Sequence, residues 1–150
     1  IAVEVQEAKG FGRCRMLPLA DASAASLHAF VTEHVEPGAR VITDGWQGYN
    51  DLAKLGYDHK PLVLDGEPEK AEAHLSMIHL IFSNLKTWLW GTHRSVSSKH
   101  LQAYLNEYVF RFNRRFYPMT AFNSVLGLAV RSEPPTYDEL YSGKWVHPGA

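Results

Sequence analysis

The chain has 150 residues, with 45% hydrophobic and 12% aromatic content and a formal net charge of −1 at pH 7, which fits one folded domain and argues against disorder. The single cysteine, Cys14, excludes an internal disulfide and a cysteine-based zinc cluster, and it fits a reducing, cytoplasmic location. No apolar run approaches the length of a membrane span and no signal peptide is visible, so we expect no membrane partner.

The first 64 residues are predicted to alternate between strands and helices. The alternation of apolar and polar residues over Ile1–Gln6 predicts a strand, and Pro18 marks the end or the edge of the next one. Asp21 or Ser23 is a candidate N-cap of the first helix. In chain order we expect strands over 1–6 and 13–19 joined by a turn over 7–12, a helix over 22–35, a strand over 40–43, a short helix over 51–55 closed by Gly56, and a strand over 59–64.

The rest of the chain is predicted to be mainly helical. Residues 101–112 place apolar side chains at the spacing of one helix face, with Ser97 or Ser98 as the N-cap. The order of strands and helices predicts an α/β layered fold with a mixed sheet. In chain order we expect an acidic loop over 65–72, a helix over 74–90 ended by Gly91, the helix over 101–112, a candidate third helix over 119–130 and an irregular tail over 132–150.

The charges are unevenly distributed along the chain. Residues 79–116 contain six Lys or Arg against one acid, Glu107, whereas the other residues contain nine basic against fifteen acidic groups. A basic segment in a nearly neutral protein indicates a polyanionic partner. The basic residues at the end of the helix over 101–112 also fit a solvated helix end favoured by the helix dipole. The basic residues of the segment are Lys86, Arg94, Lys99, Arg111, Arg114 and Arg115.

Two polar side chains are candidates for a functional site. Asp44 directly follows the apolar strand over 40–43, and groups at the carboxyl ends of strands in open α/β sheets face the crevice where ligands bind. A carboxylate there suits Mg²⁺, or it only caps the turn into the next helix. Asn84 lies on or beside the apolar stripe of the helix over 74–90, so its amide either has protein partners or projects into a cleft.

Five short motifs from Thr43 onward occur together in this order: Thr43–Tyr49 (TDGWQGY), Ser83–Leu89 (SNLKTWL), Gly91–His93 (GTH), His100–Leu105 (HLQAYL) and Phe110–Arg115 (FRFNRR). They resemble the motifs of bacterial insertion-sequence transposases of the D-D-E superfamily. The similarity is to a variant in which asparagine replaces the third acid and a lysine follows two residues later, a D-D-N-K pattern. The resemblance covers about residues 1–130.

The resemblance implies an RNase H-like fold, in which a mixed sheet is flanked by helices. The catalytic domain would cover residues 1–130, and residues 131–150 would form an irregular C-terminal tail. In this family the first catalytic aspartate lies on a strand upstream of a segment similar to Ile1–Gln6, and no residue here occupies its position. We therefore expect a domain that is truncated at its N-terminus, lacks the first strand and is inactive alone.

By the same resemblance, Asp44 matches the second catalytic aspartate, Asn84 the third position and Lys86 the lysine that follows it. Asp44 and Asn84 would bind Mg²⁺ or Mn²⁺, and metal ions in such sites activate a water or a 3′-hydroxyl and stabilise the leaving oxygen. Lys86 would offset phosphate charge or orient the DNA end, although a solvated surface lysine is the simpler interpretation. The implied reaction is phosphodiester hydrolysis and strand transfer at transposon ends.

The implied partner is DNA, both transposon ends and target. We expect Arg94, Lys99, Arg111, Arg114 and Arg115 to contact its phosphates. We also expect a homo-oligomer of the full-length protein and a cytoplasmic, nucleoid-associated location. Two other functions stay open: a non-catalytic DNA-binding remnant of a transposase that uses only the basic helices, and an interaction module whose basic face meets an acidic protein.

Overall fold

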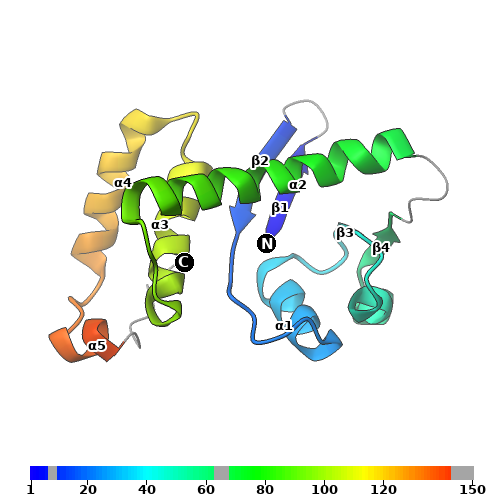
Figure 1. The fold of residues 1–150 in the computed structure, drawn as a ribbon, viewed down its shortest axis with the longest axis horizontal. Coiled ribbons are helices and arrows are strands. Elements are labelled where there is room, and N and C mark those ends of the chain that lie inside the picture. Colours follow the sequence, from blue (N-terminus) through cyan, green and yellow to red (C-terminus); the bar gives the residue numbers. More distant parts are fainter. Residues whose placement is uncertain (7–9, 63–67, 143–150) are drawn as a thin grey trace. The chain divides into compact units, whose positions relative to one another are not determined.

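The computed structural model describes residues 1–6, 10–62 and 68–142, and within the long second helix it describes side chains from residue 78 onward. The fold is mixed α/β, as expected, and its strands form two two-stranded sheets (Figure 1). No described helix is both long enough and apolar enough to cross a membrane. In chain order the elements are β1 (Ala2–Gln6), β2 (Gly10–Arg15), α1 (Ala24–His34), β3 (Arg40–Thr43), η1 (Gln47–Leu55), β4 (Asp58–Pro61), α2 (Pro68–Trp88), η2 (Leu89–His93), η3 (Ser98–His100), α3 (Leu101–Asn113), α4 (Pro118–Arg131) and α5 (Tyr137–Ser142).

The chain divides into two compact units. The unit that we call continuous holds Leu17–Asn84 and the single residue Ala2, and the discontinuous unit holds Ile1 and Val3–Met16 together with the chain from Leu85 onward. The boundary between them falls inside α2. The predicted domain over residues 1–130 and the RNase H-like arrangement of one mixed sheet stay predictions.

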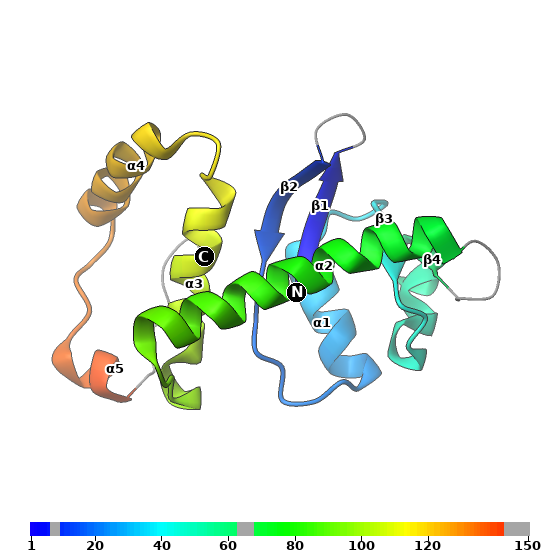
Figure 2. The same ribbon diagram turned by 45° about the horizontal axis from the view of Figure 1, so that its top comes forward.

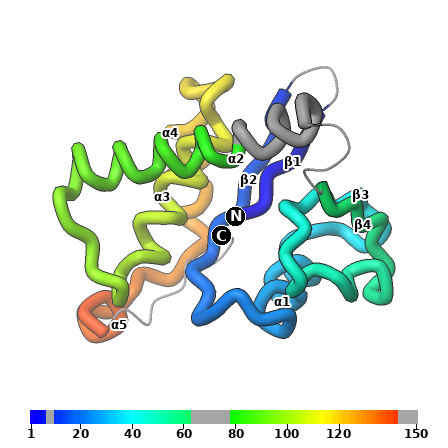
Figure 3. The backbone as a smooth tube through the Cα atoms, turned by 45° about the vertical axis from the view of Figure 1, so that its right-hand side comes forward, coloured from blue at the N-terminus to red at the C-terminus, as the bar shows by residue number. Residues whose placement is uncertain are grey.

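Side chains of α1, of η1 and of the segment that leads into β4 form the core of the continuous unit. Figure 3 traces the backbone of the chain, with α1 and β4 labelled. Phe30 and Val31 lie one apart on α1, on the face predicted from helical spacing, and they pack with Leu52 and Tyr57. Leu52 has no exposed surface, and the Tyr57 hydroxyl donates a hydrogen bond to a backbone carbonyl at the end of α1. Ser23 is the N-cap of α1, so one of the two predicted caps is confirmed.

The β3–β4 pair positions the residues that follow β3. The two strands are parallel, with Arg40 opposite Asp58 and Thr43 opposite Pro61, and η1 forms the connection between them. The strand predicted over 40–43 is confirmed. The strand predicted over 59–64 is observed over Asp58–Pro61; residues 63 and 64 lie outside the described part.

In the discontinuous unit, β1 and β2 pair and run in opposite directions (Figure 2). The strand over 1–6 is confirmed, but the turn predicted over 7–12 is wrong in its second half, because β2 already begins at Gly10. Gly12 fits inside the strand since it has no side chain: a Cβ there would collide with the carboxylate of Glu4. β2 ends at Arg15, so the predicted extension to residue 19 is also wrong.

Helix α3 is attached to β2 by side chains that bind the strand's backbone, which we call the α3–β2 contact (Gln102, Asn113 and Arg115 with residues 11–16). Asn113 Oδ1 accepts from the Cys14 N–H at 2.7 Å, and Asn113 Nδ2 donates to the Cys14 carbonyl at 3.2 Å. Gln102 Nε2 donates to the carbonyl of Met16 at 3.3 Å. Arg115 donates to the carbonyls of Gly12 and Phe11.

Cys14 lies at the centre of the α3–β2 contact. Its side chain is 1% exposed, and burial raises the pKa of its thiol to about 11. The thiol is therefore protonated at neutral pH and behaves as a small apolar side chain. Leu105, on the α3 stripe predicted from periodicity, is also buried, whereas the other stripe residues are half-buried.

Three predictions for the second half of the chain are corrected: the length of the acidic loop, the helix end at Gly91 and the irregular tail. The acidic loop predicted over 65–72 is shorter, because α2 begins at Pro68, where proline suits the first turn of a helix; residues 65–67 lie outside the described part. Gly91 does not end the helix, because η2 continues as a π-helical turn to His93. The rings of Trp88 and Tyr104 pack on His93, at 5.0 and 4.5 Å between centroids, and hold this turn.

The tail from residue 131 is not wholly irregular, since α5 spans Tyr137–Ser142. Its start is a capping box: Glu139 Oε2 accepts from the backbone N–H of Thr136 at 2.8 Å, and Thr136 Oγ1 accepts from the Glu139 N–H at 3.3 Å. The Thr-x-x-Glu spacing of this reciprocal pattern is visible in the sequence, although no helix was predicted there. The third helix is confirmed as α4, and residues 143–150 lie outside the described part.

We expect Asn113→Ala to lower the free energy of unfolding by about 2–4 kcal/mol, because it leaves a buried N–H and a carbonyl of β2 without partners. Urea denaturation followed by circular dichroism measures this change. Asn123→Ala is the matched control, since Asn123 is exposed on α4, and it should change stability by less than about 0.5 kcal/mol. Equal stability of Asn113→Ala and the parent chain would contradict the structural role of this amide.

Candidate active site

Asp44 stands at the carboxyl end of β3 and is exposed. Its Oδ1 accepts a hydrogen bond from the Trp46 backbone N–H at 3.1 Å, which closes a turn over Gly45, a residue with φ of +79°. Among the described residues, the second carboxylate oxygen, Oδ2, has no hydrogen bond and no ion pair. Asp44 therefore caps the turn, as one interpretation predicted, and still has an oxygen available for a ligand.

The turn after β3 is fixed by its neighbours in the continuous unit. Thr43 Oγ1 lies 2.9 Å from His59 Nε2 and 3.4 Å from the Gly45 nitrogen, which donates to it. Trp46 Nε1 donates to the Ala22 carbonyl at 3.0 Å. His59 was not predicted to belong to this site. The one signal in the sequence for its proximity was that the predicted strand over 59–64 follows soon after Asp44.

The two aromatic side chains near Asp44, Trp46 and Tyr49, differ in burial. Tyr49 is half-buried and packs against the core of the continuous unit. Burial, and secondly the negative charge of Asp44, raise the pKa of its phenol. Trp46 is 52% exposed although its ring nitrogen is bonded. Asp44 thus has a phenol within electrostatic range and a fixed indole two residues away.

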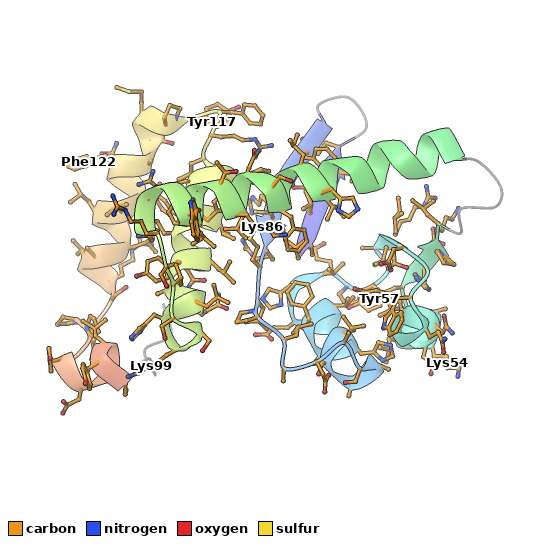
Figure 4. The ribbon with its side chains drawn as sticks, in the orientation of Figure 1. Lys54, Tyr57, Lys86, Lys99, Tyr117 and Phe122 are labelled. Carbon is orange, nitrogen blue, oxygen red and sulfur yellow. The ribbon has the colours of Figure 1, made fainter. Side chains whose placement is uncertain are left out.

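Asn84 and Lys86 lie on α2. Asn84 is exposed, whereas Ile81 and Leu85 are 4% and 6% exposed, so Asn84 lies beside the buried stripe and not on it. Lys86 is also exposed (Figure 4). Asn84 belongs to the continuous unit with Asp44, and Lys86 belongs to the discontinuous unit. Among the described residues, no hydrogen bond or ion pair joins Asp44 to Asn84.

The donor atoms at Asp44 and Asn84 suit a divalent metal ion. A carboxylate oxygen and an amide oxygen are the hard ligands that Mg²⁺ and Mn²⁺ prefer, and Asp44 Oδ2 and the exposed Asn84 amide are both accessible. Within the described part of the chain, no group of three or more His, Cys, Asp or Glu side chains could hold a metal ion. The chemistry of the two donors therefore fits, and the described residues do not add a third acidic ligand.

The predicted DNA-binding residues differ in how many contacts their charged groups make with other protein groups. Arg94 is exposed, and it has the only positive φ, +59°, of any described residue other than glycine. Lys99 Nζ lies 4.7 Å from the ring centre of Tyr141 on α5 (Figure 4). Arg111 forms an ion pair of 2.9 Å with Glu107 that stays largely exposed. Arg114 stacks its guanidinium on Phe110 at 3.8 Å. These four side chains remain accessible at least in part.

Arg115 is the exception among these residues. It is half-buried, its guanidinium donates to three backbone carbonyls, and it stacks on the rings of Phe112 and Phe116 at 4.0 and 4.3 Å. The sequence indicated only a basic group at a helix end. The structure adds a role in holding α3 to β2, which the charge pattern could not reveal.

The sequence of residues 1–113 matches a family of insertion-sequence transposases, enzymes that act on DNA. The family is described as the ISXO2-like transposase domain, and because the match covers 113 of 150 residues, the chain belongs to it. The resemblance to insertion-sequence transposases is thereby confirmed. The match ends at the last residue of α3, so α4 and α5 lie outside it. No curated protein and no solved structure matches the chain.

We expect Arg115→Ala to lower the free energy of unfolding by about 1–3 kcal/mol, because it leaves backbone carbonyls without a donor. Arg111→Ala, in the last turn of α3, should change it by less than about 0.5 kcal/mol, since exposed ion pairs contribute little. Urea denaturation of both variants checks this. If Arg115→Ala were as stable as Arg111→Ala, the contacts of Arg115 with β2 would not contribute to stability.

Proposed function

We propose that the chain is the catalytic core of a transposase that cuts and joins DNA ends with Mg²⁺ or Mn²⁺. This proposal depends mainly on one observation. The carboxylate of Asp44 is exposed at the carboxyl end of a strand, and its Oδ2 has no partner among the described residues. Membership of a transposase family supports the reaction class. The D-D-N-K pattern assigns Asn84 and Lys86 to the same site.

Each of the three residues has a distinct chemical task in this proposal. A bound divalent metal ion supplies a Lewis acid that activates a water or a 3′-hydroxyl and stabilises the leaving oxygen. Asp44 attracts the cation with its negative charge, and its bond to the Trp46 N–H fixes the direction of the carboxylate. Asn84 offers a neutral oxygen, which holds a cation less tightly than a carboxylate does. Lys86 offsets the charge of a DNA phosphate.

The proposal includes the RNase H-like catalytic domain over residues 1–130 and a homo-oligomer of the full-length protein on paired transposon ends. It also includes a cytoplasmic, nucleoid-associated location. None of residues 1–150 matches the first aspartate of the D-D-N-K pattern. We therefore expect no cleavage of DNA by residues 1–150 alone, and the test of the site is metal binding.

We expect the chain to bind Mn²⁺ and Asp44→Asn to abolish this binding in titration calorimetry. An asparagine at position 44 keeps a side-chain oxygen for the bond to the Trp46 N–H, so the turn is retained while the negative charge is lost. The change therefore separates the ligand role of Asp44 from its capping role.

Asp51→Asn is the control for this measurement. Asp51 is an exposed aspartate seven residues further on, paired with Lys54 at 2.7 Å, and its loss should leave Mn²⁺ binding unchanged. Equal Mn²⁺ affinity of the Asp44→Asn variant and the parent chain would remove Asp44 from the metal site.

A second function, DNA binding without catalysis, is favoured by four of the five predicted DNA-binding residues, which stay accessible in the segment over 79–116. We propose that they contact DNA phosphates. The affinity for DNA then falls strongly as the salt concentration rises, and substitution of Asp44 does not change it. The four are Arg94, Lys99, Arg111 and Arg114.

We expect each of Arg94→Gln, Lys99→Gln and Arg111→Gln to reduce the slope of log affinity against log salt concentration by about 1, the value for one lost phosphate contact. Fluorescence anisotropy with a duplex oligonucleotide at several salt concentrations measures the slope. Arg131→Gln, an exposed arginine at the end of α4, is the control and should not change it. Unchanged slopes in all three variants would point to an acidic protein partner instead.

A further inference from the structure

Thr43, the last residue of β3, has a buried polar side chain that is 8% exposed. A buried hydroxyl needs hydrogen-bond partners, and both partners of this one have consequences for Asp44. One is the N–H of Gly45, the residue that follows Asp44, at 3.4 Å. The other is Nε2 of His59 on the neighbouring strand, at 2.9 Å.

The register of the sheet explains why His59 reaches Thr43. His59 lies opposite Val41 in the parallel β3–β4 pair, and residues two apart on a strand share a face. His59 and Thr43 are therefore diagonal neighbours on one face of the pair. The imidazole is half-buried, with the Tyr49 ring centre 6.5 Å from its own, so its position is set by the packing of β4 and η1.

Asp44 is held between two hydrogen-bond chains. On one side, the chain runs from His59 through the Thr43 hydroxyl to the Gly45 N–H. On the other side, Asp44 Oδ1 accepts from the Trp46 N–H, and the Trp46 ring nitrogen donates to the Ala22 carbonyl. Because the amides of the next two residues, Gly45 and Trp46, are both held, the carboxylate has a defined direction, and its Oδ2 has no partner among the described residues.

We propose that His59 is a positioning residue for Asp44, acting through the Thr43 hydroxyl. The imidazole fixes the rotamer of Thr43, the hydroxyl holds the Gly45 amide, and this amide orients the turn that presents the carboxylate. The role of the turn in metal binding rests on the proposed function of Asp44. Residues that orient a ligand in this way typically change metal affinity by about 10–100-fold when altered.

The first test is amide hydrogen exchange by NMR on the full chain, which does not depend on metal. His59→Phe keeps the ring but removes Nε2, and Thr43→Val keeps the shape but removes the hydroxyl. We expect both to accelerate exchange of the Gly45 and Trp46 amides by about fivefold, the effect of losing one ordinary hydrogen bond.

Two conservative variants and one reference amide complete this test. His59→Gln, whose terminal amide can replace Nε2, and Thr43→Ser, which keeps a hydroxyl, should retain slow exchange. The Leu62 N–H, which donates to the Thr43 carbonyl at 2.8 Å, should stay protected in all four variants and report that β3 and β4 remain paired. Exchange at the parent rate for Gly45 and Trp46 in both His59→Phe and Thr43→Val overturns the proposal.

The second test is the Mn²⁺ dissociation constant of the same variants. We expect His59→Phe and Thr43→Val each to raise it about tenfold, and the double variant to raise it no further, because both changes break one chain. Independent, multiplying effects would overturn the route through Thr43. If instead the parent chain and Asp44→Asn bind Mn²⁺ equally, the metal role of Asp44 fails, and amide exchange alone still decides whether His59 positions the turn.

Discussion

The backbone groups of β2 need hydrogen-bond partners, and side chains of α3 provide them. Asn113 pairs with both the N–H and the carbonyl of Cys14 across 99 residues of sequence, so a single amide does what a neighbouring strand would otherwise do. Gln102 binds the carbonyl of Met16, just past the end of β2, and Arg115 binds that of Gly12 within the strand. Because an unpaired buried peptide group costs about 1–3 kcal/mol, the position of α3 along β2 is strongly specified.

This constraint divides the basic segment into two functional parts. The charge of Arg115 is used inside the discontinuous unit, where three backbone carbonyls accept from it. The side chains of Arg94, Lys99, Arg111 and Arg114 stay accessible to a polyanion. A count of basic residues therefore overstates the charge that DNA would meet, and only the geometry shows which arginine is already occupied.

Local features of the fold could be predicted from the sequence to a large extent. The alternation over Ile1–Gln6 and the spacing over 101–112 predicted β1 and α3, and the apolar run over 40–43 placed Asp44 at a strand end. Two of the errors involve side chains that are distant in the sequence, whereas α5 was missed although its capping box is local. In β2, Gly12 lies so close to Glu4 that a Cβ would not fit. The π-helical turn at Gly91 is held by the rings of Trp88 and Tyr104 on His93.

The candidate site shows the same division between local and distant causes. Asp44 and Asn84 were found from their own positions in a strand and a helix, and the capping bond of Asp44 lies within its turn. His59 could not be found in this way, because its link to Asp44 passes through Thr43 and depends on the register of two strands. Periodicity indicates which face a residue occupies, but it does not indicate which residue of the next strand lies beside it.

The discontinuous unit also constrains the order of events during synthesis. Apart from Ala2, the continuous unit is formed by one stretch of chain, Leu17–Asn84, so most of its contacts can form once that stretch has left the ribosome. β1 and β2 emerge earlier, but the amide that completes Cys14 arrives only with Asn113, the final residue of the family match. Until then, β2 lacks its partners from α3, and such an unpaired edge is a site of wrong pairing between chains. Folding of the N-terminal hairpin is thus coupled to translation of a segment 99 residues downstream.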